Sequence, residues 1–133
     1  MTDARKAIIK AAKSGDLEKV KALVEADANL IYARDSDGST ALHCATWKGH
    51  PAVVAYLLGA GADVKAHNSN EHWGTTPLHA AGHANQAIIA QMLIDYGADV
   101  NAKDLNGKSP LYHTTFHKAK AAAKVLQNNG AEK

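Results

Sequence analysis

One short block of sequence occurs three times in the chain at a nearly regular spacing. It reads Gly-Ser-Thr-Ala-Leu-His-Cys-Ala over residues 38–45, Gly-Thr-Thr-Pro-Leu-His-Ala-Ala over 74–81 and Gly-Lys-Ser-Pro-Leu-Tyr-His-Thr over 107–114. Thr40, Thr76 and Ser109 hold equivalent places, so the copies lie 36 and 33 residues apart. A local signal repeated at such a period indicates an array of stacked units, none of which can bury its apolar face alone.

Each block has the chemistry of a helix start. The hydroxyl of Thr76 can accept a hydrogen bond from an orphan N–H of the first turn. Pro77 suits the first helical position, where its fixed φ helps and its missing N–H costs nothing. His79 follows the cap by three residues, so we expect its side chain to contact Thr76 or the neighbouring turn.

Each predicted helix is followed by a break and a second helix. The first unit is expected to have helices over 4–12 and from the cap Asp16 onward, and the second unit over 40–48 and through 53–58. The third unit continues through 88–94 and the last through 125–126. Gly15 and Gly49 break the first two units, whereas Asn85 and Lys118 hold the same place later. Asn tolerates a left-handed conformation, and Lys118 adopts one at a cost.

The bulk composition limits the class of protein. A chain of 133 residues that is 46% hydrophobic is expected to fold as one globular domain. A formal net charge of +2 is too weak to predict a nucleic-acid or membrane partner. A lone cysteine, Cys44, and the lack of an apolar run near residue 1 predict an intracellular, cytoplasmic chain.

The repeated units resemble the ankyrin repeat. The resemblance rests on Gly-x-Thr-Pro-Leu-His-x-Ala-Ala, then Gly-His, Val-Val-x-x-Leu-Leu and Gly-Ala-Asp-Val-Asn-Ala. Residues 35–67 and 71–103 match closely, and 1–34 and 104–132 match loosely. The implied fold is an all-α solenoid of four helix-turn-helix units with short β-turn fingers, forming a single domain over 1–133. Its parts are an N-terminal capping repeat (1–34), a second repeat with a finger insertion (35–70), a third repeat (71–103) and a C-terminal capping repeat (104–133).

Two departures from the repeat pattern predict features of the structure. Residues 68–70 (Asn-Ser-Asn) are interpreted as an insertion in the finger. Charged and polar side chains in the first and last units predict solvated outer faces. The residues concerned are Arg5, Lys6, Lys10, Lys120, Lys124 and Gln127.

The resemblance implies a function on the concave face, which is made of finger tips and the exposed sides of the first helices. We therefore predict a non-catalytic, monomeric module without a cofactor that binds a protein or peptide partner. The predicted partner-binding residues are Arg34, Ser36, Asp37, Ser39, Trp47, Lys48, His67, His72, Trp73, Thr75, His83, Lys103, Leu105, Asn106, Lys108, Phe116 and His117.

The large aromatic residues single out part of this surface. Trp47, Trp73 and Phe116, which are both tryptophans and the only phenylalanine, all fall at variable positions. Large aromatic side chains are the usual anchors of protein interfaces. The alternative is that Trp47 and Phe116 pack between neighbouring units and Trp73 covers the insertion.

Eight histidines suggest a rival function, a metal-binding or catalytic groove. His79 and His83, like His113 and His117, are spaced i, i+4 and can share a helix face. No carboxylate or thiolate is seen to complete a set, so no metal is predicted. The histidines 67, 72, 83 and 117 are instead expected to line one groove and to make binding sensitive to pH.

Three further hypotheses complete the interpretation. Cys44 is interpreted as a small core residue rather than a nucleophile. Asn101, with Leu93 and Asp99 before it, resembles a substrate of the asparaginyl hydroxylase that modifies ankyrin repeats. The alternative for Asn101 is a side chain that hydrogen-bonds its own turn. A scaffold without a partner, such as an engineered consensus-like repeat, is the last rival.

Overall fold

The computed structural model describes residues 3–69 and 74–132, and the regular structure in these ranges is helical. The first unit contains α1 (Asp3–Ser14), α2 (Leu17–Ala26) and the short 3-10 helix η1 (Ala28–Tyr32). The later units contain α3 (Ala41–Lys48) and α4 (Pro51–Gly59), α5 (Pro77–His83) and α6 (Ala87–Asp95), and α7 (Pro110–His113) and α8 (Lys120–Asn128). One isolated antiparallel bridge, between Arg34 and Thr40, is the β pairing found in the described ranges. The predicted all-α solenoid is confirmed.

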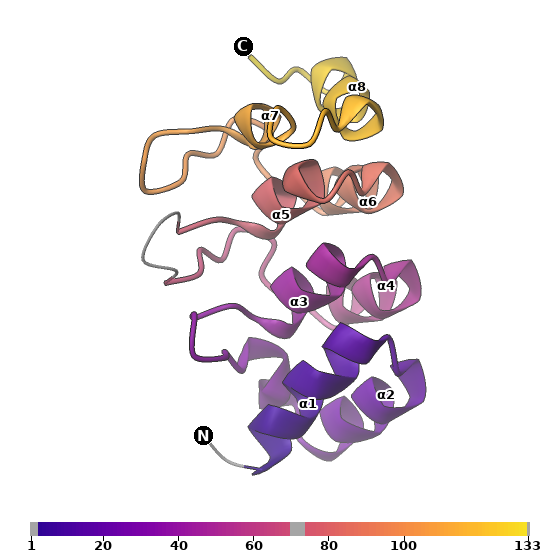
Figure 1. The fold of residues 1–133 in the computed structure, drawn as a ribbon. Coiled ribbons are helices and arrows are strands. Elements are labelled where there is room, and N and C mark those ends of the chain that lie inside the picture. The colour runs from indigo at the N-terminus through magenta and orange to yellow at the C-terminus, as the bar shows by residue number, and fades with distance from the viewer. Residues whose placement is uncertain (1–2, 70–73, 133) are drawn as a thin grey trace.

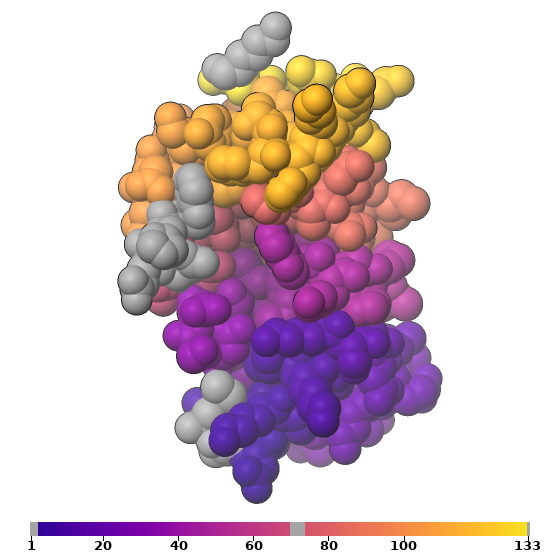
Figure 2. All heavy atoms as spheres, in the orientation of Figure 1, coloured from indigo at the N-terminus to yellow at the C-terminus, as the bar shows by residue number. Residues whose placement is uncertain are grey.

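The helices form two layers that run the length of the molecule (Figure 1). The first helices pack in chain order, α1 on α3, α3 on α5 and α5 on α7, and the second helices α2, α4, α6 and α8 do the same. The finger loops project from one side of the stack, and the two chain ends lie at opposite ends of it. In the space-filling view the units follow one another as successive bands of colour (Figure 2).

The core is a column of branched aliphatic side chains between the two layers. Leu42, Leu57, Leu78, Leu93 and Leu126 are each at most 1% exposed. These leucines come from the second, third and fourth units, so each unit completes the core of the next.

The predicted apolar helix over 88–94 forms, but its side chains do not all face the core. Ile89 and Leu93 are buried, whereas Ile88 is 74% exposed and points away from the column.

The repeated block starts helices as its chemistry predicts. The Thr76 hydroxyl accepts the backbone N–H of His79 at 3.4 Å, and His79 Nδ1 accepts the Thr76 N–H at 3.1 Å. Thr40 and His43 repeat this reciprocal capping box. Ser109 caps α7 through the N–H of Tyr112. The hydroxyl and the imidazole thus satisfy donors that would otherwise be buried without partners.

The same histidines also link neighbouring units. His43 Nε2 lies 2.8 Å from the carbonyl oxygen of Thr75, and His79 Nε2 lies 2.9 Å from that of Lys108. A carbonyl oxygen can only accept, so Nε2 carries the proton in both rings. Each imidazole therefore joins the start of its helix to the finger of the following unit.

Replacing Thr76 with alanine is expected to lower the free energy of unfolding by about 1–2 kcal/mol, because the helix loses its cap and His79 loses a partner. Thermal melts followed by circular dichroism will measure the change as a fall of several degrees in Tm. Thr115→Ala is a suitable control, because its hydroxyl is exposed and bonds only the nearby Tyr112 carbonyl. Equal melting of wild type and Thr76→Ala would show that the cap contributes nothing.

The breaks between paired helices use the left-handed conformation predicted for them. Asn85 has φ 56° and Lys118 has φ 53°. The equivalent positions of the first two units are Gly15 and Gly49, each with φ 77°. Asn85 also has a structural role, since its side-chain oxygen accepts the N–H of Ala122 at 3.0 Å. This bond joins the third unit to the start of α8.

The finger of the third unit differs from the prediction in where its extra residues lie. Asn68 donates its N–H to the carbonyl of Thr75, as Asp35 does to Ser39 and Asp104 does to Lys108. Its side-chain oxygen likewise accepts the Thr75 N–H. Asn68 thus occupies the place of the two aspartates and is not inserted, so the additional residues follow it.

Candidate binding surface

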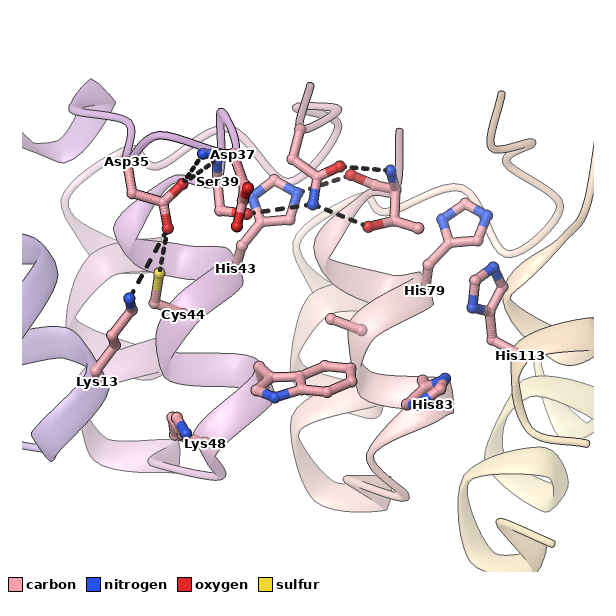
Figure 3. A pocket seen from close by; sticks show the side chains of 14 residues that line it. Lys13, Asp35, Asp37, Ser39, His43, Cys44, Lys48, His79, His83 and His113 are labelled. Atoms are coloured by element: carbon pink, nitrogen blue, oxygen red, sulfur yellow. Dashed lines mark hydrogen bonds and ion pairs between the residues drawn. The ribbon is translucent and has the colours of Figure 1, made fainter. Parts of the chain in front are cut away.

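A groove of about 400 Å³ runs along the face formed by the fingers and first helices of successive units. Its lining comes from all four units, from α1 to α7 (Figure 3). The lining residues are Lys13, Asp35, Asp37, Ser39, His43, Cys44, Trp47, Lys48, Asn68, Thr75, His79, Ala80, His83 and His113. The concave face predicted from the sequence is therefore hollowed at its centre.

The structure divides the predicted partner-binding residues into three groups. Asp37, Ser39, Trp47, Lys48, Thr75 and His83 line the groove. Arg34, Ser36, His67, Lys103, Leu105, Asn106, Lys108, Phe116 and His117 lie outside its lining. His72 and Trp73 lie outside the described residues, and so does the expectation that Trp73 joins Trp47 on one surface.

Some of the outlying residues hold the fingers together. Arg34 donates from a guanidinium nitrogen to the carbonyl oxygens of Gly38 at 2.6 Å and His67 at 2.8 Å. His67 continues the series, with Nε2 3.1 Å from the carbonyl oxygen of Lys103. Equivalent positions in three successive units are thereby joined by hydrogen bonds. Arg34 and His67 therefore stabilise the stacking of the fingers, in addition to their predicted role in partner binding.

Aromatic rings form a row across α3, α5 and the turn that follows α7. Trp47 stacks on His83 with ring centroids 4.8 Å apart and planes inclined by 26°. His83 then contacts Phe116 at 5.3 Å and His117 at 4.9 Å. Trp47 is 46% and Phe116 41% exposed. We call Trp47, His83, Phe116 and His117 the aromatic row. The rings contact neighbouring units, as the packing alternative expects, and each still leaves part of its surface in solvent. Their role as partner anchors stays a prediction.

The histidines that line the groove overlap only in part with the four predicted to do so. His83 lines it as predicted, His67 and His117 do not, and His72 lies outside the described residues. His43, His79 and His113 line it in addition. His43 and His79 were not expected there because they start helices, yet their imidazoles reach the finger of the next unit.

The protonation of these histidines is controlled mainly by burial. Burial lowers the pKa of His43 and of His79 to about 4, although a backbone carbonyl partner raises each pKa in part. Burial also lowers the pKa of His83, helped by the nearby His117 and His113. His43 and His79 are therefore neutral at pH 7.

A buried pair beneath the last finger was missed from the sequence. His113 Nε2 lies 2.8 Å from Asp104 Oδ2, and both side chains are at most 4% exposed. Burial alone would raise the pKa of Asp104, but hydrogen bonds from His113 and from the Lys108 and Asn106 N–H groups outweigh it and lower that pKa. The expectation that no carboxylate partners the histidines is therefore wrong.

A signal for this pair was present in the sequence. Asp104 and His113 are nine residues apart, and so are Asp35 and Cys44, whose Sγ lies 3.9 Å from Asp35 Oδ2. The shared spacing joins the first residue of a finger to the same position of the following helix.

The ligand atoms of His79, Asp104 and His113 lie within 4.8 Å of one another, close enough to suggest a metal site. Their donor and acceptor atoms are already engaged. His79 uses Nδ1 on Thr76 and Nε2 on Lys108, and Asp104 accepts two backbone N–H groups with Oδ1 and His113 with Oδ2. A metal would have to displace these bonds, so the cluster is best explained as a brace between finger and helix.

Cys44 is buried, as predicted. Burial first, and then the negative charge of Asp35, raise the pKa of its thiol to about 11. Since the thiolate is the nucleophilic form, this environment disfavours a reactive cysteine.

Asn101 contacts the C-terminal segment rather than its own turn. Its side-chain oxygen accepts the N–H of Glu132 at 2.9 Å, while its own backbone N–H bonds Asp99. Its hydroxylation stays a prediction.

No helix in the described ranges has the length and apolar character needed to cross a membrane.

Comparison with known proteins matches this architecture. The family model described as "Ankyrin repeats (3 copies)" matches residues 1–68 and again 63–133. Protein phosphatase 1 regulatory subunit 27 of Mus musculus is 44% identical over 64 residues, 48% of this chain and 41% of that protein. The 26S proteasome non-ATPase regulatory subunit 10 of Homo sapiens is 43% identical over 53 residues, 40% of this chain and 24% of that protein.

A further relative is the transient receptor potential cation channel subfamily A member 1 homolog of Caenorhabditis elegans. It is 40% identical over 67 residues, 50% of this chain and 6% of that protein. The chain therefore spans less than half the length of each of these three relatives. Because the two matches to the family model together span residues 1–133 and the helices stack as paired units, the chain belongs to the ankyrin repeat family.

Proposed function

We propose that the chain is a non-catalytic module that binds a protein or peptide partner through its concave face. The observation that carries the proposal is the aromatic row. Trp47 and His83 line a groove that extends over all four units, and Phe116 and His117 extend the exposed aromatic surface beyond it. Ankyrin repeats generally mediate protein–protein interaction, and two of the similar proteins are named as regulatory subunits.

The chemistry of the groove supports binding rather than catalysis. The Cys44 thiol has a raised pKa, and His43 and His79 each commit both ring nitrogens to structural bonds. Trp47, in contrast, offers a large apolar face at low entropic cost, which is the character of an interface anchor.

The partner-binding face is tested by comparing two pairs of substitutions in affinity capture from a lysate of the native cell. Trp47→Ala with Phe116→Ala removes exposed rings of the aromatic row. Ile88→Ala with Tyr96→Ala removes side chains on α6 and just after it that are 74% and 56% exposed. We expect a specific partner to be lost with the first pair and kept with the second. Loss of one true anchor weakens affinity by about 2 kcal/mol, roughly thirtyfold.

Thermal melts of both pairs separate binding from folding. Trp47 and Phe116 also contact His83, so their removal is expected to lower Tm by a few degrees, whereas loss of Ile88 and Tyr96 should leave Tm close to that of the wild type. Capture is therefore compared well below both Tm values. Capture that depends on Ile88 and Tyr96 but not on Trp47 and Phe116 would contradict the proposal.

A further inference from the structure

Positive charge is concentrated on α1 and at the end of α3, the first helices of the first two units. Their basic side chains are Arg5, Lys6, Lys10, Lys13 and Lys48, against a single acidic one, Asp3. α5 and α7 contribute neither lysine, arginine nor carboxylate. The second helices are nearly balanced, with three acidic and four basic residues. Although the net charge of the chain is only +2, its first two units therefore carry a local excess of basic residues on their first helices.

Two adjoining hollows bring most of these lysines together. Lys6, Lys10 and Lys13 lie at helical spacing on α1 and line a shallow hollow with Ile9 and Ser14. Lys13 also lines the groove described above, in which Lys48 projects from α3 (Figure 3). Lys13 thus makes the two hollows continuous from the first unit to the second.

Most of the lysines on this path lack a negative partner. Asp35 is largely engaged, since its Oδ1 accepts the N–H groups of Asp37 and Ser39 and its Oδ2 lies 4.0 Å from Lys13 Nζ. Within residues 3–69 and 74–132, Lys6, Lys10 and Lys48 make no ion pair.

We propose that the path defined by Lys6, Lys10, Lys13 and Lys48, here called the lysine path, binds an acidic polypeptide segment that also carries a large apolar side chain. The inference rests on the proposed function and specifies the chemistry of the partner. Lys6 and Lys13 are separated by about 10 Å along the helix axis, which roughly three residues of extended peptide can span. The partly exposed Trp47 adjoins the end of the path at Lys48 and supplies the apolar contact.

The surroundings of the lysine path favour a polypeptide over a nucleic acid. Asp35 and Asp37 lie in the same groove, where they would repel a continuous phosphate backbone. The carboxylates of a peptide can be spaced to avoid them, and a net charge of +2 is far from the strongly basic character of nucleic-acid-binding domains.

Fluorescence anisotropy with a synthetic probe tests the inference. The probe is a labelled dodecapeptide in which glutamates alternate with serines and two leucines replace serines, so that its carboxylates are spaced, and its matched control carries glutamines in place of the glutamates. We expect the wild-type chain to bind the acidic probe, with an affinity that falls as salt is added, and to bind the glutamine probe at least tenfold more weakly.

Two charge-matched variants locate the binding surface. Lys6→Glu with Lys10→Glu reverses two charges on the path, whereas Lys19→Glu with Lys65→Glu makes the same change in net charge on α2 and in the turn after α4. All four lysines are exposed, and circular dichroism will verify that both variants fold. The first variant should lose at least about tenfold in affinity for the probe, and the second less than about twofold. The reason is that salt screens electrostatic interactions beyond a distance of about 8–10 Å.

Equal losses in the two variants would overturn the inference, because binding would then follow net charge alone. Absence of probe binding, equal binding of the glutamine probe, or tighter binding of a single-stranded oligonucleotide would overturn it too. In each of these cases, partner capture that still depends on Trp47 would leave the proposed function standing. If the acidic probe binds as expected but partner capture does not depend on Trp47, the proposed function is contradicted while binding of an acidic segment at the lysine path still stands.

Discussion

Acidification from pH 7.5 to pH 5 is expected to lower the free energy of unfolding by about 4 kcal/mol, with His43 and His79 contributing about equally. Both pKa values are about 4 in the folded chain and near 6.5 when unfolded. As the pH falls below 6.5, the unfolded chain takes up protons that the folded chain cannot. Stability is therefore kept above pH 6.5 and lost progressively down to about pH 4. Urea titrations at several pH values will measure the change.

A variant that cannot titrate at one of these positions provides the control. In His79→Gln the amide can still donate to the Lys108 carbonyl, but it has no pKa in this range. The part of the pH dependence that His43 and His79 contribute should then fall by about half, while the contribution of His83, whose pKa is also lowered, stays. The comparison holds even if the variant is less stable at every pH. The depressed pKa of Asp104 acts only below its ordinary value of 3.8 and so leaves this window unaffected. Identical pH profiles for variant and wild type would contradict the assignment.

Gly82→Ala is expected to destabilise the fold by about 1–3 kcal/mol, although alanine is the better helix former. A β-carbon at Gly82 would lie 2.7 Å from the carbonyl oxygen of Pro110 and 3.4 Å from Cγ2 of Thr114. The first of these atoms belongs to the backbone of α7, so α5 and α7 would have to separate. Urea unfolding will give the change in free energy.

The chain contains a matched glycine at which the opposite sign is expected. Gly59 ends α4, and a β-carbon there would meet nothing within 4 Å. Gly59→Ala should therefore stabilise by up to about 1 kcal/mol, through helix propensity alone. If both substitutions stabilised the chain, the close approach of α5 and α7 would be refuted as a constraint.

The features that could be predicted from the sequence depend on short stretches of chain. The cap at Thr76 and the left-handed turn at Asn85 follow from chemistry within a few residues of each, and both are observed. The repeat spacing then supplies the stacking, because a unit with one apolar face must cover it with a neighbour.

The features that were missed depend on distances across the fold. His113 and Asp104 meet only because the finger folds back over its helix, and Gly82 is constrained by a backbone oxygen 28 residues further along, at Pro110. The place of Asn68 was misjudged because its hydrogen bonds, rather than its residue type, make it equivalent to Asp35.

The imidazole bonds between units have a consequence for how the chain is divided. His43 and His79 start helices in their own units, but the carbonyls that satisfy their Nε2–H groups belong to the next finger. Truncation of the chain at a repeat boundary would leave the Nε2–H group of one of these histidines without its acceptor, which costs about 1–3 kcal/mol of stability. A truncation that keeps these bonds must therefore be out of phase with the sequence repeat: it begins at one helix start and includes the finger beyond it.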